Sequence, residues 1–465
     1  MSIGTDDSPL RVAIVGSGPA GFYAAGHLLK PKDRVVQVDM FDRLPTPWGL
    51  VRAGVAPDHP NIKAVSRVYE KTAAHPEFRF YGNVEFGRDL DLDDLASRYH
   101  AVIYAVGAQT DRQMGIPGED LPGSWAATEF VAWYNAHPDY REVEFDLSAE
   151  RAVVIGNGNV AMDVTRMLAS DCDDLAKTDV ADHALEVLRQ SNVKEVVVLG
   201  RRGPAQAAFT NPELLELGEM TGADVIVDAE DCEIDPLSAE SIEGEGHLTA
   251  RKNVEILRDY SAKDPTGSDR RIVLRFLVSP VEIVGDDKVE AIRIVRNELQ
   301  RQEDGSLRPR PTEETEEIPC GLVFRSIGYR GVPLPGVPFD EGRCVIPNEG
   351  GRILGDGEHL PGQYAVGWIK RGPTGIIGTN KKDAQETVDM LFEDLDAGRL
   401  PAPEDPDRDS LEELLSERAP EHVTYAGWEA IDQKEKGLGE PQGRPRVKLC
   451  TFEELLEAAR TKSAA

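Results

Sequence analysis

The sequence has few cysteines, and they are scattered. No two of them form a C-x-x-C pair, which argues against a zinc site and against a redox-active dithiol of the usual spacing. Such cysteines suit a reducing cytoplasm, and we expect no resident metal. The five residues are Cys172, Cys232, Cys320, Cys344 and Cys450.

The chain also has few positively charged residues relative to its negatively charged ones. The chain has 52 Lys and Arg against 83 Asp and Glu, a formal net charge of −31. Such a chain repels nucleic acid phosphates and anionic membrane surfaces. The N-terminal residues lack the pattern of a signal peptide, and no stretch of about 18 residues is uninterruptedly apolar. We therefore expect a cytoplasmic protein that neither binds polynucleotides nor enters a membrane; its oligomeric state stays open.

The chain does contain enough material for large hydrophobic cores. Its 465 residues are 40% hydrophobic and include 43 glycines, which suits two large domains or about three structural units. A strand, a glycine turn and a helix follow one another twice, first from residue 11 and again from residue 151. This repeat predicts two nucleotide-binding α/β units.

The first repeat is Gly16-Ser-Gly18-Pro-Ala-Gly21, between a β-branched strand at 11–16 and a helix at 22–29. The first glycine permits a tight turn, the second lets a pyrophosphate approach the backbone, and the third lets helix and strand pack closely. The phosphate then meets a helix N-terminus. A second strand, at 35–41, ends at Asp42, which we expect to bind the ribose hydroxyls. Asp39 is a competitor, but it lies within the strand.

The second repeat departs from the first. It reads Gly156-Asn-Gly-Asn-Val-Ala161, with alanine in place of the third glycine, and a strand at 194–199 leads to Arg201 and Arg202 where an NAD site would place an acid. Two guanidinium groups bind a 2′-phosphate bidentately, so the pattern predicts NADP in preference to NAD. The alternative is a solvated surface pair.

The order of these patterns predicts one domain inserted in another. We expect an α/β fold with two nucleotide-binding Rossmann-like domains and parallel sheets. Residues 1–108 would form the first part of an FAD domain, 109–329 an NADP domain, and 330–465 the second part of the FAD domain with a helical tail. Residues 223–320 are expected to be β-rich. In the tail, helices are predicted at 411–418 and 451–460.

Two dinucleotides on one chain suggest electron transfer between a flavin and a nicotinamide. The glycine-rich run at 367–380 precedes a further helix, whose N-terminus would stabilise negative charge on a reduced flavin ring. A structural loop before a surface helix is an equally good interpretation of this run.

Four motifs carry a resemblance to a known family. They are Leu44-Pro-Thr-Pro-Trp-Gly-Leu-Val-Arg-x-Gly-Val-Ala-Pro-Asp-His-Pro60, Gly156-Asn-Gly-Asn-Val160, Gly200-Arg-Arg-Gly-Pro204 and Gly367-Trp-Ile-Lys-Arg-Gly-Pro-Thr-Gly-x-Ile-Gly-Thr-Asn380. Together they resemble the adrenodoxin-reductase family of ferredoxin–NADP reductases, most closely its actinobacterial members. The resemblance implies that NADPH delivers a hydride to FAD and that electrons then pass singly to a ferredoxin or a similar small iron–sulfur protein.

The resemblance also implies site residues. FAD would contact Gly16, Gly18, Ala20, Gly21, Asp42, Leu50, Phe86, Trp368, Gly375, Ile376 and Ile377. NADP would contact Arg112, Asn157, Gly158, Asn159, Val160, Arg201, Arg202, Glu213 and Gly375. The catalytic candidates are His59 and Glu216, matched to proton handling near the nicotinamide, although His59 also suits a loop fixed by its neighbouring prolines. The family usually has glutamate at the position of Asp42.

Other functions remain open. Without a C-x-x-C pair, the thiol chemistry of thioredoxin reductases is excluded, and the cysteine-rich N-terminus of glutamate-synthase small subunits is absent. An NADPH diaphorase or quinone reductase, and a non-catalytic flavin- and nucleotide-binding module, are the alternatives. Docking of an acidic ferredoxin needs a local basic face, for which Arg251-Lys252, Arg270-Arg271 and Lys370-Arg371 are candidates.

Overall fold

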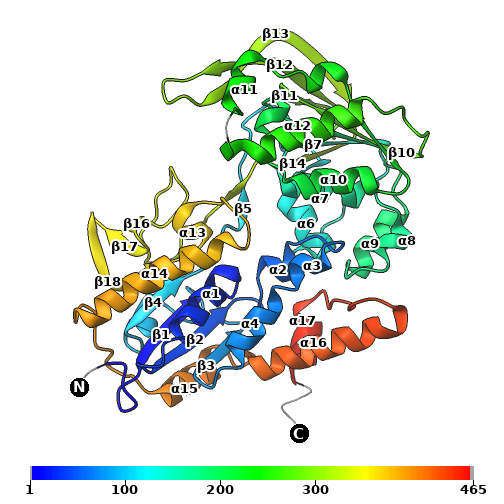
Figure 1. Ribbon diagram of the computed structural model, residues 1–465. Coiled ribbons are helices and arrows are strands. Elements are labelled where there is room, and N and C mark those ends of the chain that lie inside the picture. The colour runs from blue at the N-terminus through cyan, green and yellow to red at the C-terminus, as the bar shows by residue number, and fades with distance from the viewer. Residues whose placement is uncertain (1–2, 244, 461–465) are drawn as a thin grey trace. The chain divides into compact units, whose positions relative to one another are not determined.

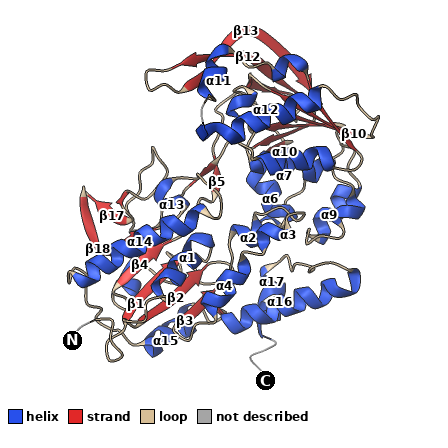
Figure 2. Ribbon diagram, viewed as in Figure 1, coloured by secondary structure: helices blue, strands red, loops and turns tan. Residues whose placement is uncertain are grey.

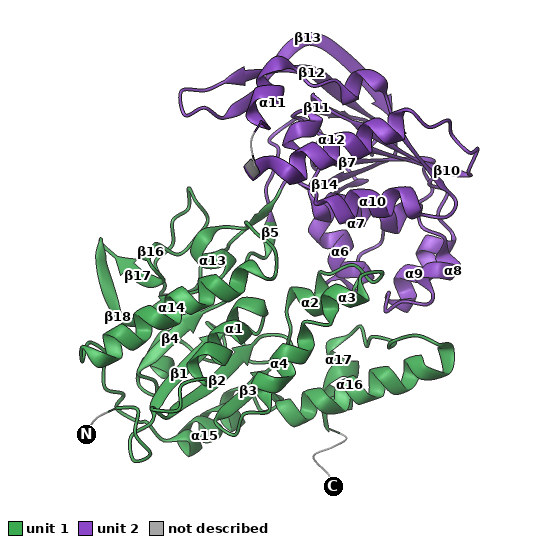
Figure 3. Cartoon of the chain, viewed as in Figure 1, with its two compact units in different colours: residues 1–110, 135–139, 328–465 green, residues 111–134, 140–327 purple. Residues whose placement is uncertain are grey.

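The computed structural model describes residues 3–243 and 245–460 of the chain. These residues form two compact units, each built from strands and helices (Figures 2 and 3). Unit 1 comprises residues 1–110, 135–139 and 328–465, and unit 2 comprises 111–134 and 140–327. A short pair of strands, β5 (Thr110–Asp111) and β15 (Tyr329–Arg330), lies where the chain passes between the units.

Unit 1 contains a large mixed sheet with helices on both faces (Figure 1). Its strands are β1 (Leu10–Val15), β2 (Val36–Asp42), β3 (Phe78–Gly82), β4 (Ala101–Tyr104), β16 (Asn348–Glu349), β17 (Arg352–Gly355), β18 (Glu358–Ala365) and β19 (Val423–Thr424). Its helices are α1 (Pro19–Leu28), α2 (Leu50–Ala53), α3 (Pro60–Lys63), α4 (Ser66–Ala73), α5 (Leu92–Ala96), α13 (Trp368–Arg371), α14 (Thr379–Asp396), α15 (Arg408–Arg418), α16 (Tyr425–Gly439) and α17 (Phe452–Arg460).

The strand order is β16-β17-β18-β4-β1-β2-β3-β19, and the run from β18 to β3 is parallel. All of β1 is buried because α1, α4 and α14 cover one face of the sheet while α5 and α15 cover the other. Since parallel strands end at one edge, the residues that follow β1, β2 and β18 meet there. This edge therefore brings Gly16, Asp42 and Gly367 to the same side of unit 1.

Unit 2 contains a six-stranded parallel sheet, ordered β6-β14-β7-β8-β10-β9, and a three-stranded antiparallel sheet, β11-β12-β13. Its strands are β6 (Ser124–Ala126), β7 (Arg151–Ile155), β8 (Glu195–Leu199), β9 (Ala223–Val227), β10 (Arg270–Arg275), β11 (Val278–Val284), β12 (Ala291–Arg301), β13 (Leu307–Pro319) and β14 (Leu322–Arg325). Its helices are α6 (Ala127–Tyr134), α7 (Asn159–Ala169), α8 (Cys172–Leu175), α9 (Asp182–Arg189), α10 (Asn211–Glu219), α11 (Pro236–Ser241) and α12 (Leu248–Ser261).

The expectation of a β-rich segment at 223–320 is wrong between β9 and β10. That part contains α12, which buries Val254, Ile256, Leu257 and Tyr260 at the three- and four-residue spacing of a helix. Long polar side chains between these positions obscured the period. The fold class is confirmed: both sheets have the strand, glycine turn and helix arrangement that the two repeats predict. Among the described residues, no helix has both the length and the hydropathy needed to cross a bilayer.

Candidate functional site

The glycine turn after β1 has the geometry of a phosphate cradle. Gly16 has φ +106°, and a Cβ there would lie 2.6 Å from the Ala105 carbonyl oxygen. A Cβ at Gly21 would lie 2.3 Å from the Gly16 carbonyl oxygen, whereas a Cβ at Gly18 would meet nothing within 4 Å. Gly16 and Gly21 are thus required by the packing of the turn itself. The space beside Gly18, at the N-cap of α1, is open to a ligand.

Asp42 is bonded to this turn. Its Oδ2 accepts hydrogen bonds from the Ser17 hydroxyl (2.5 Å) and the Ser17 N–H (2.9 Å), and its Oδ1 accepts one from the Leu44 N–H (2.9 Å). Desolvation raises the pKa of Asp42, while these hydrogen bonds act in the opposite direction. Sequence reasoning missed Ser17, because the glycine fingerprint places no demand on that position.

Asp39 has a structural role instead. It is fully buried and forms ion pairs with Arg11 (3.5 Å) and Arg408 (3.0 Å), and it accepts a hydrogen bond from Tyr99. Because these partners bind both carboxylate oxygens inside the core, Asp39 is not placed to bind a ligand at the end of β2. Of the two acids, Asp42 is the one that borders the glycine turn.

The segment after Pro47 lies against the same turn. Trp48 and Gly49 both have positive φ, 85° and 50°. A Cβ at Gly49 would lie 2.8 Å from the Gly18 Cα, so the two backbones touch. Leu50, which follows, is 37% exposed although it is a large apolar side chain. A ligand on the glycine turn would cover it.

The glycine-rich run at 367–380 begins at the end of β18. The Gly367 N–H donates to Asp383 Oδ2 (2.6 Å), and the Trp368 indole N–H donates to the Thr374 carbonyl (3.2 Å). Ile376 is 65% exposed at the tip of this run, before α14. The exposed apolar tip is consistent with a surface that a flat ring covers. Of the other predicted FAD residues, Ala20 is buried in α1 and Phe86 packs edge-on against Tyr104, with ring centroids 5.6 Å apart.

Lys370 is buried in the same region, contrary to its expected place on a docking face. Its ammonium donates to Glu386 (2.7 Å) and to the Thr387 hydroxyl (3.0 Å). The short helix α13 turns this side chain toward α14, which the sequence spacing did not reveal. Lys370 therefore fixes the loop that carries Trp368 and is not a surface cation.

In unit 2, the second glycine turn repeats the cradle. Gly156 has φ +125°, with a Cβ position 2.1 Å from the Ser326 carbonyl oxygen, and Gly158 is open at the N-cap of α7. The Asn157 carbonyl accepts hydrogen bonds from the N–H groups of residues 208 and 209, and Asn159 Oδ1 accepts one from Thr210. The side chain of Asn159 thus fixes the segment that leads into α10. Val160 lies in the first turn of α7.

Arg201 and Arg202 follow the end of β8. Arg201 is exposed and Arg202 is half-buried, and burial together with the neighbouring Arg201 lowers the pKa of Arg202. Within the part of the chain that the structure describes, no carboxylate forms an ion pair with either arginine, although the protein has a large acidic excess. Arg202 donates a long hydrogen bond of 3.5 Å to the Gln206 carbonyl. Two adjacent guanidinium groups are suited to bind an anion such as a phosphate. Arg112 is also exposed, just after β5.

Glu213 and Glu216 lie on one face of α10, opposite Arg166 of α7. Arg166 is buried and bonds to Glu213 (2.7 Å) and Asp163 (2.5 Å), and its guanidinium is 3.6 Å from the carboxylate of Glu216. Sequence analysis missed Arg166, because a helix interior gives no signal for a buried arginine. In unit 1, His59 is a buried residue that precedes α3, and its N–H donates to the Ala56 carbonyl (3.1 Å).

Two phosphate cradles on one chain, one bordered by an acid and the other by a pair of arginines, define an oxidoreductase of the two-dinucleotide class. The family model for pyridine nucleotide-disulphide oxidoreductases matches residues 10–197. NADPH-ferredoxin reductase FprA of Mycobacterium leprae is 55% identical over 96% of this chain and 97% of its own length. The mitochondrial NADPH:adrenodoxin oxidoreductase of Salvelinus fontinalis is 41% identical over 99% of this chain and 93% of its own length.

A solved structure supports the same family assignment. The structure of Mycobacterium tuberculosis FprA in complex with NADPH is 53% identical and superposes with a TM-score of 0.92, covering 97% of this chain and 99% of that one. The chain belongs to the adrenodoxin-reductase-like family of ferredoxin–NADP reductases. The predicted resemblance, down to its actinobacterial members, is confirmed.

Proposed function

We propose that this chain is an FAD-dependent NADPH:ferredoxin oxidoreductase. The observation that supports it best is the contrast between the two cradles, since Asp42 borders the first and Arg201 with Arg202 borders the second. An acid accepts hydrogen bonds from ribose hydroxyls, and paired guanidinium groups bind a 2′-phosphate. The residues fit both cofactors. When bound, FAD would supply the conversion of a two-electron hydride from NADPH into single electrons for the acceptor protein.

FAD is assigned to unit 1. The open space at Gly18 receives the pyrophosphate, and the Asp42 carboxylate, held by Ser17 and Leu44, accepts from the ribose. Exposed apolar surface at Leu50 and Ile376 is covered by the cofactor. Asp42 is shorter than the glutamate usual in the family, which reduces its reach to the ribose, but its Oδ1 accepts one bond from the protein and has a second lone pair for a ribose hydroxyl. The remaining FAD contacts that we propose are Gly16, Ala20, Gly21, Phe86, Trp368, Gly375 and Ile377.

NADP is assigned to unit 2, with Gly158 at the pyrophosphate and Arg201 and Arg202 at the 2′-phosphate. Arg166 forms an ion pair with Glu213 and lies 3.6 Å from the carboxylate of Glu216, so it orients that face of α10. We assign proton handling near the nicotinamide to His59 and Glu216, as tuning residues, because hydride transfer requires close approach of the rings and no protein acid or base. Further NADP contacts are Arg112, Asn157, Asn159, Val160, Glu213 and Gly375.

The electron acceptor is a small iron–sulfur protein, and we propose a ferredoxin. Of the basic pairs expected on a docking face, Arg251-Lys252 and Arg270-Arg271 stay candidates. Arg271 pairs with Glu195 and Lys252 with Glu255, which weakens the positive field that either pair presents. We place the enzyme in the cytoplasm, in keeping with cysteines that form no disulfide bond among the described residues of either unit.

One experiment tests the proposal as a whole. The purified protein is expected to carry FAD, and its flavin absorbance near 450 nm is expected to bleach when NADPH is added without oxygen. Turnover with ferredoxin should exceed turnover with a quinone and should slow as salt rises. A faster quinone reaction would identify a diaphorase, and bound flavin that NADPH fails to bleach would identify a non-catalytic module.

A further inference from the structure

The C-terminal helices α16 and α17 contain no recognisable motif, yet α16 carries a fully buried carboxylate. Glu435 has no exposed surface and accepts two hydrogen bonds from the Arg52 guanidinium, at 2.8 and 2.5 Å. It also accepts from Arg446 (3.1 Å) and from the Leu449 N–H (2.9 Å). Burial acts to raise the pKa of Glu435, but the two arginines outweigh it and lower the pKa. The carboxylate is therefore charged and saturated with donors.

Arg52 is bound by the tail a second time, through its backbone. The buried ammonium of Lys448 donates to the Arg52 carbonyl and to Asn135 Oδ1, each at 3.0 Å. The Arg52 guanidinium also lies over the Trp428 ring of α16, 5.4 Å from its centre. The tail thus contacts the Arg52 guanidinium through Glu435 and the Trp428 ring, and the Arg52 carbonyl through Lys448.

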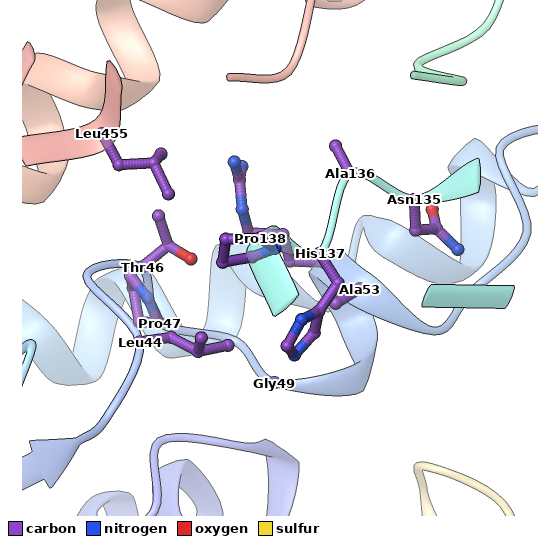
Figure 4. Close-up of a pocket in the computed structure, with 11 residues that line it drawn as sticks. Leu44, Thr46, Pro47, Gly49, Ala53, Asn135, Ala136, His137, Pro138 and Leu455 are labelled. Carbon is purple, nitrogen blue, oxygen red and sulfur yellow. The ribbon is translucent and has the colours of Figure 1, made fainter. Parts of the chain in front are cut away.

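Figure 4 shows the small pocket beside these contacts. Leu455 of α17, Thr46 and Gly49 of the loop before α2, and His137 of the segment at 135–139 contribute to its lining, together with Arg52. Segments far apart in the sequence meet here. The tail is therefore packed into unit 1 beside the loop that follows the Pro-Thr-Pro motif.

Arg52 belongs to the segment that contacts the FAD cradle. Helix α2 has only four residues and no side-chain cap, so it does not stabilise itself. It follows directly on Trp48 and Gly49, whose positive φ angles bring Gly49 against Gly18. Trp48 is fixed in turn by its N–H bond to the Ser17 carbonyl (3.1 Å) and by the Trp428 ring, 6.1 Å away and edge-on.

We infer that Glu435 is a positioning residue for the FAD site: through Arg52 it keeps Trp48, Gly49 and Leu50 against the first glycine turn. The inference rests on the proposed function, in that FAD is taken as the ligand of unit 1. It gives the C-terminal helices a role in cofactor binding although none of the cofactor contacts proposed above lies on them. An uncharged amide at this position removes the ion pair and keeps the shape.

The test compares Glu435→Gln with Glu440→Gln, an exposed change in the same segment of the full chain. FAD affinity is measured by quenching of flavin fluorescence on titration of the apoprotein, and NADP⁺ affinity by calorimetry. Glu435→Gln should weaken FAD binding about ten-fold and leave NADP⁺ binding unchanged, because about 1.4 kcal/mol of lost positioning corresponds to that factor. The control should bind both as the wild type does. Wild-type FAD affinity in Glu435→Gln would overturn the inference.

Hydrogen exchange separates positioning from general stability. In Glu435→Gln, the amides at 51–55, which bond to the carbonyls of residues 48–50, should exchange faster while those of β1 stay protected. Equal acceleration throughout unit 1 would overturn the inference. If Glu435→Gln does not fold, Lys448→Met, which removes the ammonium hydrogen bonds to the Arg52 carbonyl and to Asn135, should still weaken FAD binding. Unchanged FAD binding in that variant would overturn the inference. Failure of the wild type to bind FAD would instead refute the proposed function.

Discussion

Arginine 201 and arginine 202 should decide which nicotinamide coenzyme the enzyme uses. Replacement of both by alanine removes the charged donors that follow β8 and leaves the glycine turn intact. A hydrogen bond to a charged group contributes about 1.5–3 kcal/mol. Arg201 is exposed, so solvent screening lowers its contribution to about 0.5–1 kcal/mol, whereas Arg202 is half-buried and contributes within the full range. We expect a combined loss of about 2–4 kcal/mol.

That loss corresponds to a roughly 30-fold to 1000-fold fall in kcat/KM for NADPH, with most of the change in KM. The value for NADH should change less than about three-fold, since NADH has no 2′-phosphate to lose. The assay is NADPH- and NADH-dependent dye reduction by the double variant, by each single variant and by Arg308→Ala, an exposed change on β13 of the same unit. The single Arg202 variant should lose more than the single Arg201 variant. An equal fall with NADPH and NADH would refute the assignment of these arginines to the 2′-phosphate.

Three further predictions concern unit 1. Ser17→Ala removes a 2.5 Å hydrogen bond to Asp42 and should weaken FAD binding about five-fold, as read from flavin release; no change would mean that the backbone N–H of residue 17 suffices. Gly21→Ala places a Cβ 2.3 Å from a backbone oxygen and should abolish FAD binding, whereas Gly26→Ala in the same helix should retain it, with flavin content of the purified proteins as the measurement. Burial lowers the pKa of His137 from 6.5 to about 4, so protonation of this side chain favours the unfolded state. The free energy of unfolding should therefore fall by up to roughly 3 kcal/mol as the pH drops from about 6.5 to 4. Urea unfolding of His137→Gln should show a shallower fall over that range.

The sequence was sufficient for those parts of the fold that depend on local patterns. The turns at Gly16 and Gly156 are visible because glycine spacing, strand and helix lie within about 30 residues. The charge that follows the second strand of each repeat is equally local. These signals predicted the α/β fold, and the family resemblance added the cofactors.

Tertiary partners were not predictable in the same way. Glu435 and Arg52 lie 383 positions apart, and in the sequence Glu435 is one of several charges on an ordinary amphipathic helix. Arg166 shows the same limitation, because a buried arginine has no periodic signature. The prediction that Lys370 lies on the surface was wrong, because the burial of this side chain depends on how α13 turns toward α14. Residues that orient a site through other residues become visible only with the fold.

The brief return of the chain to unit 1 at residues 135–139 has a practical consequence for dissecting this enzyme. Asn135 is tied to Lys448, and Asp139 to Arg43, so the strip between α6 and β7 belongs with the flavin-binding part. A fragment excised at residues 111 and 327 would carry this strip away from its partners and leave buried polar groups unsatisfied on both pieces. To fold independently, a fragment containing unit 2 would need a direct link from residue 134 to residue 140. In a chimera that exchanges units between two homologous enzymes, residues 135–139 would have to come from the same parent as the rest of unit 1.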